Sequence, residues 1–169
     1  MMAVPPARPR IPLPAAVRID LLVVDKSDRN MLAFMGGELV AMYVVAIGSG
    51  GQGAKRWEGD RRTPEGEYTL NERHHSEQNH RFLHVSYPNG QDRERYSALA
   101  RAGQLPSDSS GRPVGIGGAI GVHGFGGRWP MRWFGPTIGA TAGCIRVSDE
   151  EAEELYRAVL PGASIIIRP

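Results

Sequence analysis

The chain has 169 residues, 41% hydrophobic and 22% charged, with a formal net charge of +2. This is the composition of one ordinary globular domain, and so small a charge, without a run of Lys or Arg, argues against nucleic acid as a partner. No apolar stretch of the sequence approaches the ~20 residues of a membrane-spanning helix, and a single cysteine excludes an internal disulfide.

The first 16 residues contain five prolines, which predicts a proline-rich leader or linker at 1–16 ahead of one domain at 17–169. This segment has no apolar core typical of a signal peptide. The whole chain holds 22 glycines and 13 prolines. So many turn formers indicate few long helices and favour an α+β, β-dominated fold.

Three strands are predicted first, at 17–24, 31–34 and 39–47, because apolar and β-branched residues dominate these segments. Gly36-Gly37 is a strong signal for a two-residue hairpin, so the three strands should form an antiparallel meander. A loop is predicted over 52–66 and a further strand over 82–87.

Asp92 is predicted to cap a short helix that Gly103 ends. Residues 103–127 are rich in Gly, Ser and Pro and contain one short strand at 119–123. Their glycine spacing does not match a phosphate-binding loop, which argues against nucleotide binding.

The C-terminal segment gives the clearest local pattern. Ser148 and Glu151 form a capping box at the start of a helix. Apolar residues at helical spacing continue to Leu160, and Pro161-Gly162 is predicted to end the helix. A final buried strand is expected at 165–167.

Cys144, which follows Gly143 just before this capped helix, is the candidate nucleophile. The N–H groups of Gly143 and Cys144 are predicted to form an oxyanion hole, because glycine lets the backbone approach a substrate carbonyl closely. Arg146 and the helix N-terminus are expected to favour the thiolate. A buried structural cysteine is the alternative.

His123 ends a short β-branched strand and precedes Gly124, so its ring can project into a cleft as the base for Cys144. No Asp or Asn is obviously placed as a third member, and a backbone carbonyl is therefore expected to orient the imidazole. The alternative is a core histidine with satisfied hydrogen bonds.

Three blocks of the sequence together resemble the bacterial L,D-transpeptidase (YkuD-domain) family. Val122-His123-Gly124 followed by Thr141-Ala142-Gly143-Cys144-Ile145-Arg146-Val147 is similar to its catalytic signature. The segments 59–68 (GDRRTPEGEY) and 84–89 (HVSYPN) resemble two further family segments in the same order. The resemblance spans about residues 17 to 169.

This resemblance implies a YkuD-like mixed β-sheet sandwich or barrel with a few short helices, acting on peptidoglycan stem peptides. It implies that the thiolate attacks the carbonyl of the third stem residue, expels the terminal D-amino acid and forms a thioester. An acceptor amine of a second stem peptide or a protein, or else water, would resolve the thioester. The expected location is the cell envelope or periplasm.

The residues expected to bind substrate are Arg146, Gly124, Thr141 and His84. Arg146 either binds a substrate carboxylate or supports the loop, and His84 alternates with Phe82 on one strand face. Ala142 replaces the histidine that many family members carry before Gly-Cys. An aromatic-rich insert, from Trp129 to Phe134, is expected to be a lid, a substrate wall or a packing plug.

Two alternatives to transpeptidation remain: a cysteine hydrolase of stem-peptide links, either an L,D-carboxypeptidase or an amidase, and a non-catalytic peptidoglycan-binding module. No metal or organic cofactor is expected. A metal site among His74, His75, His80 and His84 is disfavoured, because they lack the usual ligand spacing, and exposed loops are predicted for the first three.

Overall fold

The computed structural model describes residues 11–126 and 141–169. Its elements, in chain order, are β1 (Ile19–Asp25), β2 (Asn30–Met35), β3 (Glu38–Val44), β4 (Gly66–Leu70), β5 (Arg73–Ser76), β6 (His80–His84), α1 (Gly90–Arg101), β7 (Gly121–His123), β8 (Ile145–Arg146), α2 (Asp149–Ala158) and β9 (Val159–Arg168). No helix within the described ranges is both long enough and apolar enough to cross a membrane.

The strands form two sheets, one of five strands in the order β3-β2-β1-β9-β4 and one of four in the order β5-β6-β7-β8. The pairs β1–β9 and β7–β8 are parallel, and the remaining pairs are antiparallel. The predicted α+β, β-dominated class with mixed sheets is therefore confirmed.

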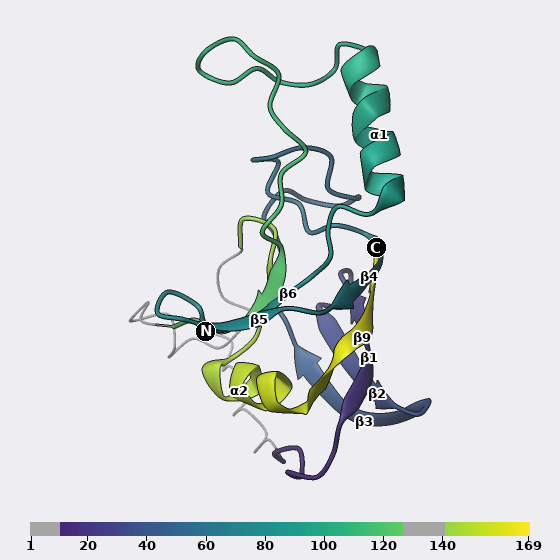
Figure 1. Cartoon of the computed structure of the whole chain (residues 1–169), viewed down its shortest axis with the longest axis vertical. Coiled ribbons are helices and arrows are strands. Elements are labelled where there is room, and N and C mark those ends of the chain that lie inside the picture. The colour runs from purple at the N-terminus through teal and green to yellow at the C-terminus, as the bar shows by residue number, and fades with distance from the viewer. Residues whose placement is uncertain (1–10, 127–140) are drawn as a thin grey trace, which may run out of the picture.

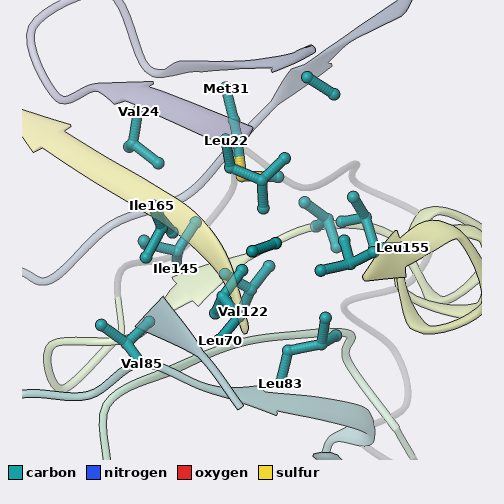
Figure 2. Packing of buried hydrophobic residues seen from close by; sticks show 14 of the residues in the cluster. Leu22, Val24, Met31, Leu70, Leu83, Val85, Val122, Ile145, Leu155 and Ile165 are labelled. Carbon is teal, nitrogen blue, oxygen red and sulfur yellow. The ribbon is translucent and has the colours of Figure 1, made fainter. Parts of the chain in front are cut away.

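One apolar core lies between the two sheets (Figure 2). Leu22 of β1 and Ile165 of β9 face it from the five-stranded sheet, and Val122 of β7 and Ile145 of β8 from the other sheet. Leu155 of α2 fills the same core, and all five side chains are fully buried. Since successive strand residues point to opposite faces, the other face of the four-stranded sheet is left for polar side chains.

The predicted antiparallel meander is confirmed by the pairing of β1 with β2 and of β2 with β3. Gly36 and Gly37 have φ values of 58° and 83°. Positive φ at both positions is what a type I′ hairpin turn requires, so the Gly-Gly pair sets this turn.

The C-terminal helix begins as predicted but ends earlier. Ser148 accepts the N–H of Glu151 and the Glu151 carboxylate accepts the N–H of Ser148, so the capping box is confirmed. The expectation that the helix runs to Pro161-Gly162 is wrong, since α2 ends at Ala158 and β9 begins at Val159. Pairing with β1 from Val159 outweighs the apolar helical pattern, and an irregularity in that pairing accommodates Pro161 and Gly162.

The first helix is capped one turn earlier than predicted. Asn89 is the N-cap of α1, and Asp92 is the third helical residue, whose carboxylate accepts the N–H of Asn89. Both residues can accept from a helix N-terminus, and the extended backbone at Asn89 decides which one is the cap. Figure 1 shows α1 and the loop after it at one end of the molecule, away from α2.

The polar stretch between residues 66 and 84 is mostly strand. β4 and β5 were not predicted, and β6 covers His80–His84 instead of 82–87. The loops expected for His74, His75 and His80 are wrong, because these residues lie in the β5–β6 hairpin. An edge strand exposed to water carries no apolar alternation, so its sequence pattern resembles a loop.

The segment before β1 contacts the domain from residue 13 onward. Leu13 is buried in the core cluster, and its N–H donates to the Glu154 carboxylate at 2.7 Å. Arg157 donates to the carbonyl oxygens of Leu13 and Ala15. These contacts lie on the N-terminal side of the boundary predicted at residue 17, and residues 1–10 of the leader or linker predicted at 1–16 lie outside the described residues.

Candidate active site

Two parallel neighbours in the four-stranded sheet bring the predicted pair together. Val122 is in register with Ile145, and His123 with Arg146. Cys144 immediately precedes β8 and is therefore level with Gly121, one diagonal step from His123. Side chains two residues apart along a strand point to the same face of the sheet. Residues separated by 21 positions thus share one face of the sheet.

The residues before the nucleophile form a tight turn, here called the cysteine turn (residues 141–144). The Thr141 hydroxyl donates to the Cys144 carbonyl at 2.6 Å and accepts the Gly143 N–H at 3.1 Å. Gly143 has a φ of 139°, and a Cβ there would lie 2.9 Å from the Arg62 carbonyl oxygen. The backbone angle and the contact both exclude other residues at position 143. The two bonds of the Thr141 hydroxyl and this requirement for glycine explain why Thr and Gly flank position 142.

The Cys144 side chain lies against the start of β7. Its thiol donates to the Ala119 carbonyl at 3.5 Å. Burial raises the pKa of the Cys144 thiol, and the Gly121 N–H and the Lys55 ammonium only partly oppose this effect. The expectation that the surroundings favour a thiolate is therefore wrong for the free protein, since desolvation outweighs the nearby positive groups.

His123 is buried, with 8% of its surface exposed, and its orientation is set from two sides. Nδ1 lies 2.6 Å from the Gly124 carbonyl oxygen, which agrees with the expected role of a backbone carbonyl. A carbonyl only accepts, so Nδ1 carries the proton and Nε2 of the neutral ring holds the lone pair. The ring of Phe82, whose centroid is 5.6 Å away at an interplanar angle of 5°, stacks on the imidazole.

Phe82 is a site residue that was not predicted as one. Its ring lies where a side chain at Gly121 would be, so glycine at 121 lets the ring reach His123. Phe82 and His123 are also cross-strand partners. The alternation of Phe82 with His84 on one strand face was visible in the sequence, but it did not indicate that His123 would lie opposite Phe82.

Arg146 lies next to His123 across the strand pair, and its guanidinium is 4.5 Å from the centroid of the Phe125 ring. The residue is buried, and its N–H and carbonyl both bond to Ala46. These contacts favour the loop-supporting role, while carboxylate binding by Arg146 stays a prediction. Gly124 contributes the carbonyl that holds His123.

His84 lies on the same sheet face, 3.2 Å from His74 between Nε2 and Nδ1. Burial and the neighbouring His74 lower the pKa of His84. A contact of His84 with substrate stays a prediction. Within residues 11–126 and 141–169, no group of three or more His, Cys, Asp or Glu is arranged to hold a metal ion.

The oxyanion donors are not equivalent in this structure. The Gly143 N–H already donates to the Thr141 hydroxyl. Of the two predicted oxyanion donors, the Cys144 N–H is the one that takes no part in this bond. The insert from Trp129 to Phe134 lies outside the described residues. A thiol that shares one face of a sheet with an imidazole is suited to nucleophilic attack assisted by a general base.

Comparison with known proteins agrees with this geometry. Residues 19–167 match the model of the YkuD family, described as an L,D-transpeptidase catalytic domain. No curated protein matches the sequence significantly.

Several solved structures share the fold. The helical cell shape determining protein Pgp2 from Campylobacter jejuni has a TM-score of 0.58 at 18% identity, over 90% of this chain and 48% of that one. Bd1075 from Bdellovibrio bacteriovorus has a TM-score of 0.57 at 22% identity, over 94% and 50%. An L,D-transpeptidase from Xylanimonas cellulosilytica has a TM-score of 0.52 at 18% identity, over 94% and 65%.

This chain thus spans about half the length of the first two structures. At such identities the likeness concerns the fold, while the family match covers nearly all of the domain. The chain belongs to the YkuD family of L,D-transpeptidase catalytic domains.

Proposed function

We propose that this domain is a peptidoglycan L,D-transpeptidase that acts through a thioester on Cys144. The observation that carries the proposal is the position of His123, whose Nδ1 lies against the Gly124 carbonyl, on the strand that pairs with β8 directly after Cys144. Family membership supports a stem peptide as the substrate.

In the first half-reaction His123 Nε2 takes the thiol proton as Cys144 Sγ attacks the carbonyl of the third stem residue. The C–N bond to the terminal D-amino acid then breaks. His123 returns the proton to the leaving amine, and the acyl group stays on sulfur as a thioester. In the second half-reaction an acceptor amine attacks the thioester, loses a proton to His123 and forms a new amide, while the thiol is restored.

The resting state of the thiol shapes this mechanism. Since burial raises the pKa of Cys144, the free domain holds a neutral thiol that donates to Ala119. Proton transfer to His123 then accompanies substrate binding instead of preceding it. A raised pKa also keeps the thiol from reacting with small electrophiles between turnovers.

The remaining predicted residues would act around the reacting carbonyl. The Cys144 N–H would donate to the oxyanion, and the Gly143 N–H would join it if the Thr141 hydroxyl gives up that bond. Arg146, Gly124, Thr141 and His84 would line the stem-peptide site. Because the substrate is peptidoglycan, we place the enzyme in the cell envelope or periplasm, with an acceptor amine from a second stem peptide or a protein.

Mass spectrometry of the products from defined tetrapeptide muropeptides tests this function. With a second muropeptide as acceptor, we expect loss of the terminal D-amino acid together with a cross-linked dimer that Cys144→Ala does not form. A trimmed tripeptide without any dimer would identify an L,D-carboxypeptidase, and cleavage of other links an amidase. Binding without any product would identify a non-catalytic module and overturn the proposal.

A further inference from the structure

The chain contains only two lysines, Lys26 and Lys55, and both are buried in ion pairs. Each side chain is 4% exposed, and each ammonium lies 2.8 Å from a carboxylate oxygen, of Glu65 for Lys26 and of Asp60 for Lys55. Burying an ammonium is costly even when it is paired. A chain that otherwise uses arginine for positive charge therefore has its two lysines, the more compact cations, at buried sites.

The bonds of Lys26 are all structural. Its Nζ donates to the carbonyl oxygens of Gly53 and Thr63 and to the Glu65 carboxylate. These three acceptors use the three protons of the ammonium. Lys26 thus fastens the loop before β4 to the end of β1.

Lys55 has a different pattern of contacts. Its Nζ donates to the Trp57 carbonyl at 3.1 Å and to the Asp60 carboxylate at 2.8 Å. Within the part of the chain that the structure describes, these are its two acceptors, one fewer than the ammonium can serve.

Asp60 organises the loop around Lys55, here called the Lys55 loop (residues 55–62). Besides Lys55, its carboxylate accepts the N–H groups of Arg56 at 2.7 Å and Arg62 at 3.0 Å. Burial pushes the pKa of Asp60 upward, but the Lys55 ammonium and these N–H groups outweigh it and hold the pKa below its usual value. The Asp60 carboxylate therefore stays charged.

The Lys55 loop packs directly on the cysteine turn. The Arg62 carbonyl oxygen would lie 2.9 Å from a Cβ on Gly143, and a Cβ on Gly48 would overlap the Arg61 carbonyl and lie 3.0 Å from the Gly143 Cα. The backbone that Asp60 holds in place is thus in contact with the residue before Cys144. The positive charge of Lys55 reaches the sulfur and favours its ionised form.

We propose that Lys55, fixed by Asp60, is a positioning residue of the cysteine site whose ammonium stabilises the negative charge that develops on the Cys144 sulfur. The inference rests on the proposed function, in which that charge forms during attack. The other groups at the sulfur are the Gly121 N–H and the Ala119 carbonyl, while His123 of β7 and Arg146 of β8 are the titratable and charged residues of the two strands beside it. Asp60 is the counter-charge of Lys55, so its negative charge acts on the sulfur in the opposite direction.

The test is the pH dependence of iodoacetamide alkylation, followed by intact mass, because Cys144 is the only thiol in the chain. The wild-type midpoint should lie above that of an ordinary thiol, as burial dictates. Lys55→Met should raise this midpoint by about one pH unit, which is about a tenfold slower reaction at a fixed pH below it. Lys26→Met is the matched control: it loses an equally buried ion pair and should leave the midpoint where it is.

Two further variants separate charge from structure. Lys55→Arg retains the positive charge and should keep most of the wild-type midpoint. The double variant Lys55→Met with Asp60→Asn leaves no unpaired carboxylate in the loop and should still raise the midpoint. It also remains informative where Lys55→Met alone does not fold.

Equal midpoints in the wild type and the double variant, or equal shifts for Lys26→Met and Lys55→Met, would overturn the inference and leave Lys55 a structural residue. Alkylation needs no peptidoglycan, so the outcome is independent of whether muropeptides are turned over. Cross-linking activity combined with an unshifted midpoint would remove Lys55 from the mechanism and leave the proposed function intact.

Discussion

The five-stranded and four-stranded sheets share one core but differ in strand length and in what their strands carry. In the first sheet, β1, β2, β3 and β9 have 6–10 residues, and β9 pairs with both β1 and β4. In the second, β7 has three residues and β8 has two. His123 ends β7, and Cys144 directly precedes β8.

This difference has a physical reason. Long paired strands bury continuous apolar surface and supply most of the stability. Short strands end within the sheet, so their terminal residues lie beside loops and can present polar side chains to a substrate. Loss of core volume in the first sheet should therefore lower the stability, and loss of polar side chains in the second should lower the turnover. Variants in each sheet test that division.

The largest effect is expected for Cys144→Ala, which removes the nucleophile. Turnover of muropeptides should fall by at least about a thousandfold, because loss of a nucleophile disables the whole catalytic unit. The thermal unfolding midpoint should change little, since alanine replaces one small, partly exposed side chain. Residual activity within about tenfold of wild type would exclude Cys144 as the nucleophile.

His123→Ala should be next, with turnover lower by about 10²–10⁴-fold, the usual contribution of a general base. The matched control is His75→Ala, on the exposed part of β5 in the same sheet, which should leave turnover unchanged. Initial rates on a defined muropeptide measure both. Equal rates for the two variants would mean that the pairing of His123 with Cys144 is wrong.

Leu22→Ala tests the other sheet, where the effect should be on stability. Leu22 is fully buried in β1, and truncating it should lower the free energy of unfolding by about 2–5 kcal/mol. Met42 on β3 is 64% exposed, so Met42→Ala should change it by less than about 0.5 kcal/mol. Denaturant unfolding measures the change in the free energy of unfolding for both variants. The kcat of the folded Leu22→Ala protein should equal that of wild type. A loss of kcat without a loss of stability would contradict the division between the sheets.

Thr141→Val should give the smallest effect, because it removes only the hydroxyl that makes two bonds within the cysteine turn. Each such bond contributes about 1 kcal/mol, so unfolding should become easier by about 1–3 kcal/mol and turnover should fall about tenfold as the turn loosens. Thr141→Ser keeps the hydroxyl and should restore both. If serine is no better than valine, the hydroxyl does not hold the turn.

Several parts of this molecule were predictable because they depend on neighbours in sequence. The Gly36-Gly37 hairpin and the capping box of Ser148 with Glu151 are local structures, and the structure confirms both. The start of α1 was misplaced by three residues, since Asn89 and Asp92 both fit the cap and a reciprocal pair of bonds uses them together.

Other parts depended on partners far along the chain. The β5 and β6 hairpin was hidden by its polar sequence, and Val159 joined β9 instead of α2 because β1 pairs with it. Lys55 was visible only as one of two lysines in an arginine-rich chain. Asp60 lies inside the recognisable segment 59–68, and Lys55 lies five residues before Asp60. Composition alone could not show that this spacing matters.

The sequence by itself determined the family, the identity of the candidate nucleophile and base, and the turns and caps whose bonds span a few residues. Tertiary structure decided the rest: the stacking of Phe82 on His123, the contact between the Lys55 loop and the cysteine turn, and the ionisation of Cys144. The reason is that a local hydrogen bond depends on spacing along the chain, whereas burial and charge act through space. The protonation of the thiol is set by water excluded and charges gathered from segments that the sequence places far apart.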